Sequence, residues 1–250
     1  MADSRVVEIQ NLSKRFDELI VLDNISLEVN RAENLVVFGR SGQGKSVLLK
    51  CIIGLMHPDS GEVLINGQNI FELSISQLNK LRKNIGFLFQ GSALYDSMSV
   101  RENLSFPLKR HFPEMKHSDI SDKVFSTLEL VGLEDAIDKM PSELSGGMKK
   151  RIALARSIIT DPQLMLYDEP TTGLDPITTK EISELILNLQ KKLNMTSIAV
   201  THDLICAEII ADRAIFLKDA KVAYEGSIKE LTDSKDPFLK NFFSNEIIKV

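Results

Sequence analysis

The chain has 250 residues, of which 43% are hydrophobic and 26% are charged, and a formal net charge of -5 at pH 7. This length can bury a large core in one domain or in a core with an inserted lobe. The acidic balance gives no electrostatic signature of nucleic-acid binding, no signal peptide stands at the N-terminus, and no apolar run approaches the ~18 residues that cross a bilayer. We therefore expect a cytoplasmic protein whose cysteines, Cys51 and Cys206, are reduced and buried.

Strand patterns and helix patterns alternate along the chain. Strand patterns alternating with helices predict an α/β fold with a mostly parallel sheet and helices on both faces. From about 91 to 156 the pattern becomes helical, with a break at Pro141, and this stretch is expected to form an inserted lobe. The expected strands are 6–12, 20–29, 35–38, 62–65, 85–89, 164–167, 196–200 and 214–217.

A complete phosphate-binding loop lies between the apolar strand 35–38 and the helix that follows. Its glycines let successive backbone N–H groups point at an anion, and the helix adds the positive end of its dipole. Lys45 is expected to reach the β- and γ-phosphates of a nucleotide, and the Ser46 hydroxyl to hold Mg²⁺. A glycine-rich turn without chemistry is the alternative, but the strand before and the helix after favour the site. The loop consists of Gly39, Arg40, Ser41, Gly42, Gln43, Gly44, Lys45 and Ser46.

Two carboxylates, Asp168 and Glu169, end the apolar strand 164–167. Paired acids are often only solvated surface charges, but here an apolar strand that is expected to be buried leads directly into them, which argues against that interpretation. At the end of a central strand, Asp168 can hold Mg²⁺ and Glu169 can polarise an attacking water.

Three further positions follow expected strands or the acidic pair. Gln90 follows the strand 85–89 and could complete a Mg²⁺ shell, while His202 follows the strand 196–200 and could orient water at a γ-phosphate. Each is weak alone, because a lone Gln is usually a loop residue and a lone His is usually structural. Asp175, in the stretch Gly173-Leu174-Asp175, precedes a helix expected to begin near Pro176.

The order of these motifs, together with Leu144-Ser145-Gly146-Gly147-Met148, resembles the nucleotide-binding subunits of ATP-binding cassette (ABC) transporters over nearly the whole chain. The resemblance implies a P-loop NTPase fold with a small antiparallel β subdomain and an inserted helical subdomain. It implies ATP and Mg²⁺ as cofactors, and an adenine-stacking role for Phe16, which lies 29 residues before Lys45.

The same resemblance implies that two copies assemble head to tail around two ATP molecules, with Asp175 at the seam. Each copy then supplies Ser145, Gly146 and Gly147 to the γ-phosphate held by the other. Met148 departs from the Gln that commonly ends this signature, which removes a polar contact but keeps the helix start. Within one copy, the implied site is Lys45, Ser46, Gln90, Asp168, Glu169 and His202, with Ser46, Gln90 and Asp168 at the metal.

The continuations of the phosphate loop, of the signature and of the segment Phe89–Leu108 are similar to those of the Mce- or Mla-type lipid transporter ATPases. This similarity implies phospholipid transport at the bacterial inner membrane, with the chain peripheral on its cytoplasmic face. The implied partners are a multispanning permease, which would meet residues 89–108, and an Mce-type lipid-binding protein; nucleic acid is not expected. A small-solute importer, for amino acids for example, is the main alternative, and a non-transport ATPase that regulates a membrane complex is the second.

The domain boundaries expected from these patterns are 6–242 for the cassette and 235–250 for a C-terminal tail. Three phenylalanines, Phe238, Phe242 and Phe243, make the tail too apolar to stand in solvent. They pack either on the core of their own subunit or on a neighbouring copy.

Overall fold

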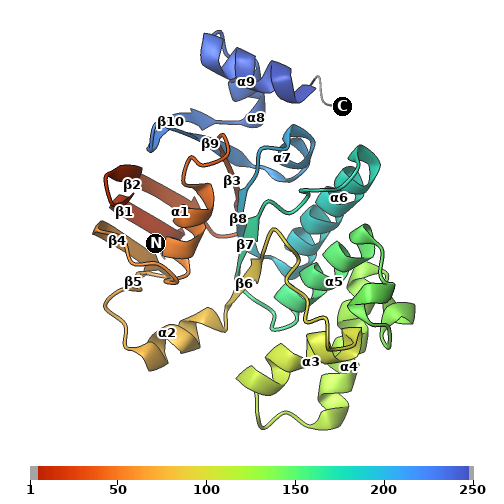
Figure 1. The fold of residues 1–250 in the computed structure, drawn as a ribbon. Coiled ribbons are helices and arrows are strands. Elements are labelled where there is room, and N and C mark those ends of the chain that lie inside the picture. Colours follow the sequence, from red (N-terminus) through yellow and green to blue (C-terminus); the bar gives the residue numbers. More distant parts are fainter. Residues whose placement is uncertain (1–4, 248–250) are drawn as a thin grey trace.

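Two β-sheets organise the structure, a computed structural model that describes residues 5–247. One has six strands in the order β10-β9-β3-β8-β7-β6, and the other has four in the order β2-β1-β4-β5 (Figure 1). The strands are β1 (Arg5–Phe16), β2 (Leu19–Asn30), β3 (Asn34–Phe38), β4 (Ser60–Ile65), β5 (Gln68–Asn69), β6 (Ile85–Leu88), β7 (Leu164–Asp168), β8 (Thr196–Val200), β9 (Arg213–Lys218) and β10 (Lys221–Gly226).

The six-stranded sheet is parallel from β9 to β6, and only the edge strand β10 runs antiparallel to its neighbour. Every residue of β3, β7 and β8 is buried, as parallel strands with both faces covered require. Alternate residues of β3 enter separate cores: Leu35 and Val37 belong to one apolar cluster, Val36 and Phe38 to the other. The sheet therefore separates two apolar cores.

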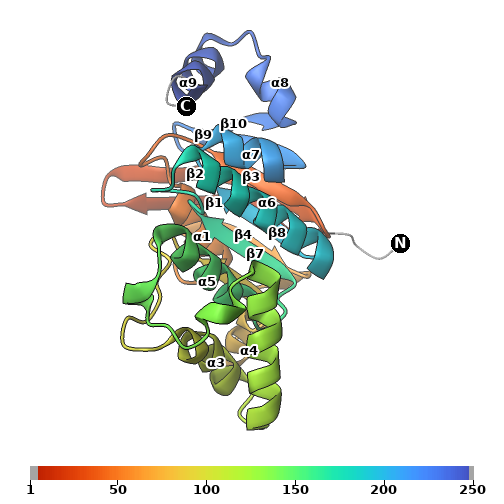
Figure 2. The same cartoon turned by 90° about the vertical axis from the view of Figure 1, so that its right-hand side faces the viewer.

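The helices are α1 (Lys45–Ile52), α2 (Ile75–Arg82), α3 (Val100–His111), α4 (His117–Val131), α5 (Gly146–Ile158), α6 (Pro176–Leu193), α7 (Leu204–Ile210), α8 (Ile228–Thr232) and α9 (Pro237–Ile247), with 3₁₀ turns at Glu134–Ala136 and Pro141–Glu143. Helix α1 shares its core with the four-stranded antiparallel sheet, whereas α5, α6 and α7 share the core on the opposite face of the six-stranded sheet (Figure 2).

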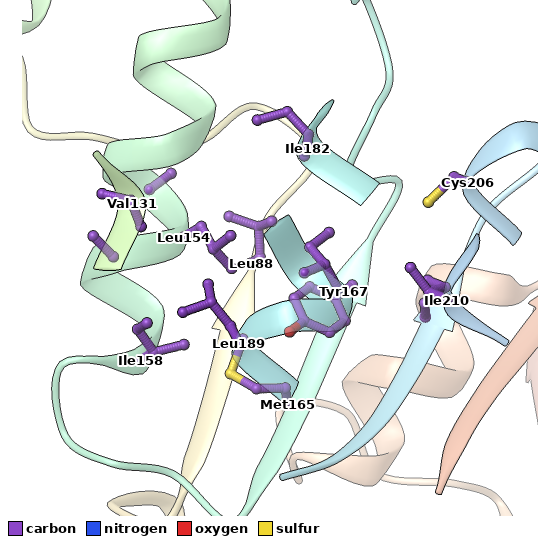
Figure 3. Packing of buried hydrophobic residues seen from close by; sticks show 14 of the residues in the cluster. Leu88, Val131, Leu154, Ile158, Met165, Tyr167, Ile182, Leu189, Cys206 and Ile210 are labelled. Atoms are coloured by element: carbon purple, nitrogen blue, oxygen red, sulfur yellow. The ribbon is translucent and has the colours of Figure 1, made fainter. Parts of the chain in front are cut away.

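Helices α3, α4 and α5 all lie in the chain between β6 and β7, and they form a helical group beside the sheet (Figure 1). Leu154 and Ile158 of α5 lie in one cluster with Leu88 of β6 and Met165 of β7, so α5 joins this group to the sheet (Figure 3). The α/β fold with a parallel sheet, an antiparallel subdomain and an inserted helical subdomain is thus confirmed.

Helix α9 packs on the core of its own subunit through aromatic side chains. The ring of Phe242 lies 4.7 Å from that of Phe216 and 6.2 Å from that of Phe38, edge to face in both cases, and Phe243 lies 5.4 Å from Phe38. The tail therefore has an intramolecular contact from Pro237 onward, and residues 248–250 fall outside the described part of the chain. A contact with a neighbouring copy stays a prediction.

Two elements that the sequence did not predict, α2 and β10, meet the cores only through half-buried side chains, among them Leu78 and Val222. None of the residues of α2 is buried, and β10 alternates only between exposed and half-buried positions. Phe16, which lies between the expected strands 6–12 and 20–29, is the last residue of β1, and Phe89, expected in the strand 85–89, lies just past β6. No helix within residues 5–247 is both long and apolar enough to cross a membrane.

Candidate active site

The turn from β3 into α1 has a backbone that requires glycine at its last position. Gly44 has φ of 86°, and a Cβ there would stand 2.6 Å from the carbonyl oxygen of Val21. Lys45 Nζ donates to the carbonyls of Gly39, at 2.7 Å, and Arg40, at 3.3 Å. The lysine side chain therefore folds over its own loop, and its ammonium lies against two of the loop carbonyls.

The acidic end of β7 meets this loop. Ser46 Oγ donates to Asp168 Oδ1 at 2.8 Å, and Lys45 Nζ lies 3.4 Å from Glu169 Oε1. Lys45, Asp168 and Glu169 are each no more than 8% exposed, so these charges stand in a setting where their attraction is only weakly screened. The parallel sheet explains the meeting, because β3 and β7 both end at its carboxyl edge on either side of β8.

Glu169 and His202 form a pair at the ends of neighbouring strands. His202 Nδ1 lies 2.9 Å from Glu169 Oε2, and Glu169 holds φ of 51°, a left-handed backbone rarely adopted outside glycine. Burial would raise the pKa of Glu169, but hydrogen bonds and charge from His202 and Lys45 together hold that pKa below its ordinary value. Glu169 is thus an ionised carboxylate, available to accept a proton or a hydrogen bond.

These groups open on a cleft of about 760 Å³. It is large enough for a small-molecule ligand, and polar and apolar groups both face it. Most of the predicted site residues line it, and Gly39 and Asp168 join it through their bonds to Lys45 and Ser46. The lining residues are Val21, Arg40, Ser41, Gly42, Gly44, Lys45, Ser46, Val47, Gln90, Glu169, His202 and Phe242.

Gln43 and Phe16, also predicted for the site, do not line this cleft. The Gln43 side chain accepts a hydrogen bond from the backbone N–H of Asp219 at 3.0 Å, and so ties the loop to the β9–β10 turn. Phe16 is 42% exposed, and Lys14 Nζ lies 5.6 Å from its ring centroid. An exposed ring at the end of β1 remains available for stacking, but adenine contact stays a prediction.

The signature (residues 144–148) and the loop Gly173-Leu174-Asp175 lie against each other, away from the cleft. Ser145 caps α5 by accepting from the N–H of Met148, and Asp175 caps α6 by accepting from the N–H groups of Ile177 and Thr178. A Cβ on Gly147 would stand 3.1 Å from Thr178 Cγ2, so the starts of α5 and α6 adjoin. Ser145, Gly146 and Asp175 are exposed. These two helix starts present one polar face that a single copy leaves open.

Sequence reasoning missed three residues of the cleft, Val21, Val47 and Phe242. Val21 and Val47 carry no motif of their own. Phe242 belongs to the aromatic tail, and its neighbour Phe238 holds the Arg40 guanidinium 5.3 Å from its ring centroid. The tail's unusual aromatic content was therefore the available signal that α9 adjoins the phosphate loop.

Comparison with known proteins identifies the family. The sequence profile described as "ABC transporter" matches residues 22–172. The chain is 41% identical over 244 residues to the intermembrane phospholipid transport system ATP-binding protein MlaF of Haemophilus influenzae, covering 98% of this chain and 92% of that protein. It is 38% identical over 242 residues to the probable ribonucleotide transport ATP-binding protein mkl of Mycobacterium leprae, covering 97% of this chain and 70% of that one.

Among solved structures, the fold matches the ATP-binding cassette MJ0796, described as a dimer in a post-hydrolysis state bound to ADP and Pi. The TM-score is 0.80 with 32% identity, covering 89% of this chain and 98% of that one. The sequence, the fold and the phosphate-loop geometry agree, and they confirm the family predicted from the motifs. The chain belongs to the ABC transporter family and is one of its ATP-hydrolysing, nucleotide-binding cassettes.

Proposed function

We propose that this cassette powers phospholipid transport of the Mce or Mla type, from the cytoplasmic face of the bacterial inner membrane. The observation that carries the proposal is the extent of the similarity to MlaF. It spans nearly the whole length of both proteins, whereas the similarity to mkl leaves about a third of that longer protein unmatched. A small-solute importer is the second candidate, and the 38% identity to mkl, named for ribonucleotide transport, is what favours it.

The proposed chemistry is in-line attack of water on the γ-phosphate of ATP. Lys45 would bind the β- and γ-phosphates at the loop, where its ammonium lies against the Gly39 and Arg40 carbonyls. The ionised Glu169 would accept a hydrogen bond from the attacking water, and His202, bonded to Glu169 through Nδ1, would orient that water and contact the γ-phosphate. Burial strengthens these charge interactions as charge develops on the phosphate oxygens.

The oxygens of Ser46 and Asp168 fit Mg²⁺ in kind. A hydroxyl and a carboxylate stand 2.8 Å apart at the loop, and both are the hard oxygen donors that Mg²⁺ takes alongside phosphate oxygens. Gln90, which lines the same cleft, would add an amide oxygen. Bound there, the ion would neutralise charge on the β- and γ-phosphates.

The proposed assembly is a head-to-tail pair of copies around two ATP molecules. The exposed helix starts carrying Ser145, Gly146 and Gly147 on α5 and Asp175 on α6 form the face that would cover the partner's ATP. Backbone N–H groups at the start of α5 suit a γ-phosphate. The dimeric MJ0796 structure supports such a pairing.

The proposed membrane partners are a multispanning permease and an Mce-type lipid-binding protein. The segment expected to meet the permease carries three exposed aromatic side chains, Phe89, Tyr95 and Phe106, with the rings of Tyr95 and Phe106 5.3 Å apart. Exposed aromatics gathered in one segment are typical of a contact surface. We also propose that residues about 91–156 act as one helical subdomain within a cassette of residues 6–242.

The function is tested by purifying the chain from its own cells in a gentle detergent and identifying the co-purifying proteins by mass spectrometry. A permease together with an Mce-type protein supports the lipid role. A permease with a solute-binding protein of another type refutes that role in favour of small-solute import, and the absence of any membrane protein refutes both.

The chemistry is tested separately with two variants of the purified chain. Glu169→Gln should keep ATP binding and accumulate ATP-bound dimers in size-exclusion chromatography, because the phosphates still bridge the copies while hydrolysis is blocked. Lys45→Ala should lose nucleotide binding. Turnover at the wild-type rate in Glu169→Gln would contradict the role given to that carboxylate.

A further inference from the structure

Lys150 is a buried cation that the proposed chemistry does not use. It is 5% exposed, and its Nζ donates to the backbone carbonyl of Gln90 at 2.7 Å. Burial lowers the pKa of Lys150, while the nearby charge of Glu169 acts in the opposite direction. Burying an ammonium is costly unless it makes strong hydrogen bonds. Moving the loop away would break the bond between Lys150 and the Gln90 carbonyl and leave the buried charge unpaired, so this bond holds the loop in place.

A second cation of the same helix holds the residues just after Gln90. Arg156 donates through Nη1 to the carbonyl of Ala93 at 2.8 Å, and its guanidinium lies 5.5 Å from the ring centroid of Tyr95. Ser92 and Ala93 have φ of 62° and 50°. Such left-handed backbone outside glycine persists where the surroundings enforce it, and here α5 supplies that restraint.

Helix α5 is one continuous helix of 13 residues, and it connects the signature with the loop that contains Gln90. At its start it carries the signature, capped by Ser145. One turn further, about 6 Å along the axis, Lys150 donates a hydrogen bond to Gln90. Because the acceptor is the backbone carbonyl, the side-chain amide of Gln90 keeps its own hydrogen-bonding groups for the cleft that it lines.

We propose that Lys150 is a positioning residue that ties the glutamine loop (residues 90–93) of one ATP site to α5, whose signature serves the other ATP site. When the signature engages the ATP held by the partner, α5 carries Lys150 with it, and Gln90 is placed at the metal side of its own site. The inference rests on the head-to-tail assembly and on the placement of Gln90 proposed above, and it adds the physical link between the two half-sites.

The test compares Lys150→Met with Lys150→Arg in the full-length chain, by binding of a fluorescent ATP analogue in EDTA and in Mg²⁺. Lys150→Met should bind within twofold of wild type in EDTA, because the phosphate loop is untouched, and should lose at least fivefold of the tightening that Mg²⁺ gives. Its Hill coefficient for ATP hydrolysis should fall toward one. Lys150→Arg, which keeps a donor, should restore both values.

Arg151→Met is the matched control, since Arg151 bonds the Val131 carbonyl and Glu181 on other sides of the same helix. It removes a cation from α5 without touching the glutamine loop, so its Mg²⁺ tightening and Hill coefficient should stay as in wild type. If Lys150→Met does not fold, Lys150→Gln, which keeps a neutral donor, replaces it. The loss of Mg²⁺ tightening and the fall in the Hill coefficient should then be in the same direction but smaller.

Equal behaviour of the Lys150 and Arg151 variants would overturn the proposal, because Lys150 would then only support the helix. An unchanged Mg²⁺ effect in Lys150→Met would overturn it as well. If Glu169→Gln forms no ATP-bound dimer, the assembly fails by itself. A loss of Mg²⁺ tightening in Lys150→Met would then still support the hold on Gln90 and overturn only the link between the sites.

Discussion

Removing the Phe242 ring tests whether α9 packs on its own subunit. Phe242 is 7% exposed and meets the rings of Phe38, Phe216 and Phe243 edge to face. Phe→Ala changes in cores cost about 3–5 kcal/mol. We expect about 3 kcal/mol for Phe242→Ala, the low end, because a terminal helix can detach as a unit. For a chain of this length, that corresponds to a fall in Tm of about 6–12 °C.

The assay is thermal denaturation of the purified chain at low and high protein concentration, with Lys240→Ala as the control. Lys240 lies on the exposed side of the same helix, so its variant should melt within a degree or two of wild type. An intramolecular contact gives the Phe242→Ala loss at every concentration. A loss seen only at high concentration would refute the reasoning, since the ring would then stabilise a contact between copies.

Two further predictions concern titratable groups. Burial raises the pKa of Cys51 to about 11 and that of Cys206 to about 12, so the native chain should leave both thiols unreacted with Ellman's reagent at pH 8, and reaction of either before denaturation would contradict their burial. Although burial opposes it, His202 and Lys45 lower the pKa of Glu169, so its charge contributes stability above the ordinary value of 4.5 and loses it as pH falls through the lowered pKa. The Tm advantage of wild type over Glu169→Gln should therefore shrink in acid, and an advantage that grew in acid would show the sign to be wrong.

The sequence predicted the parts of the fold that depend on burial and the parts of the site that depend on backbone chemistry. Strands β3, β7 and β8 are fully buried, and each contains a short apolar run, so these strands could be predicted from the sequence. The phosphate loop required glycine at Gly44 for a steric reason that the motif already encodes. Helix α2 has no fully buried residue and meets the core only through Leu78 and Leu81, so its apolar pattern is weak.

The pairings within the site followed from topology more than from any local pattern. Ser46 and Asp168 are 122 positions apart, and they meet because β3 and β7 end at the same edge of a parallel sheet on either side of β8. Motif order could suggest this meeting, but it could not supply the hydrogen bond between Glu169 and His202 or the left-handed backbone of Glu169. Both depend on how the strand ends turn.

The contacts of long cationic side chains were the least predictable feature of the site, because which groups they reach depends on how the helices and loops pack. A lysine two positions past the signature is, in the sequence, one of three consecutive basic residues, Lys149, Lys150 and Arg151. A run of like charges ordinarily indicates a solvated face. In the fold the last two diverge: Lys150 turns inward to the Gln90 carbonyl, while Arg151 reaches Val131 and Glu181. The helix thereby uses neighbouring cations to hold separate parts of the subunit, and only the buried one touches a loop of the nucleotide site. The Mg²⁺ dependence of nucleotide binding, more than overall stability, is therefore the property that should distinguish them.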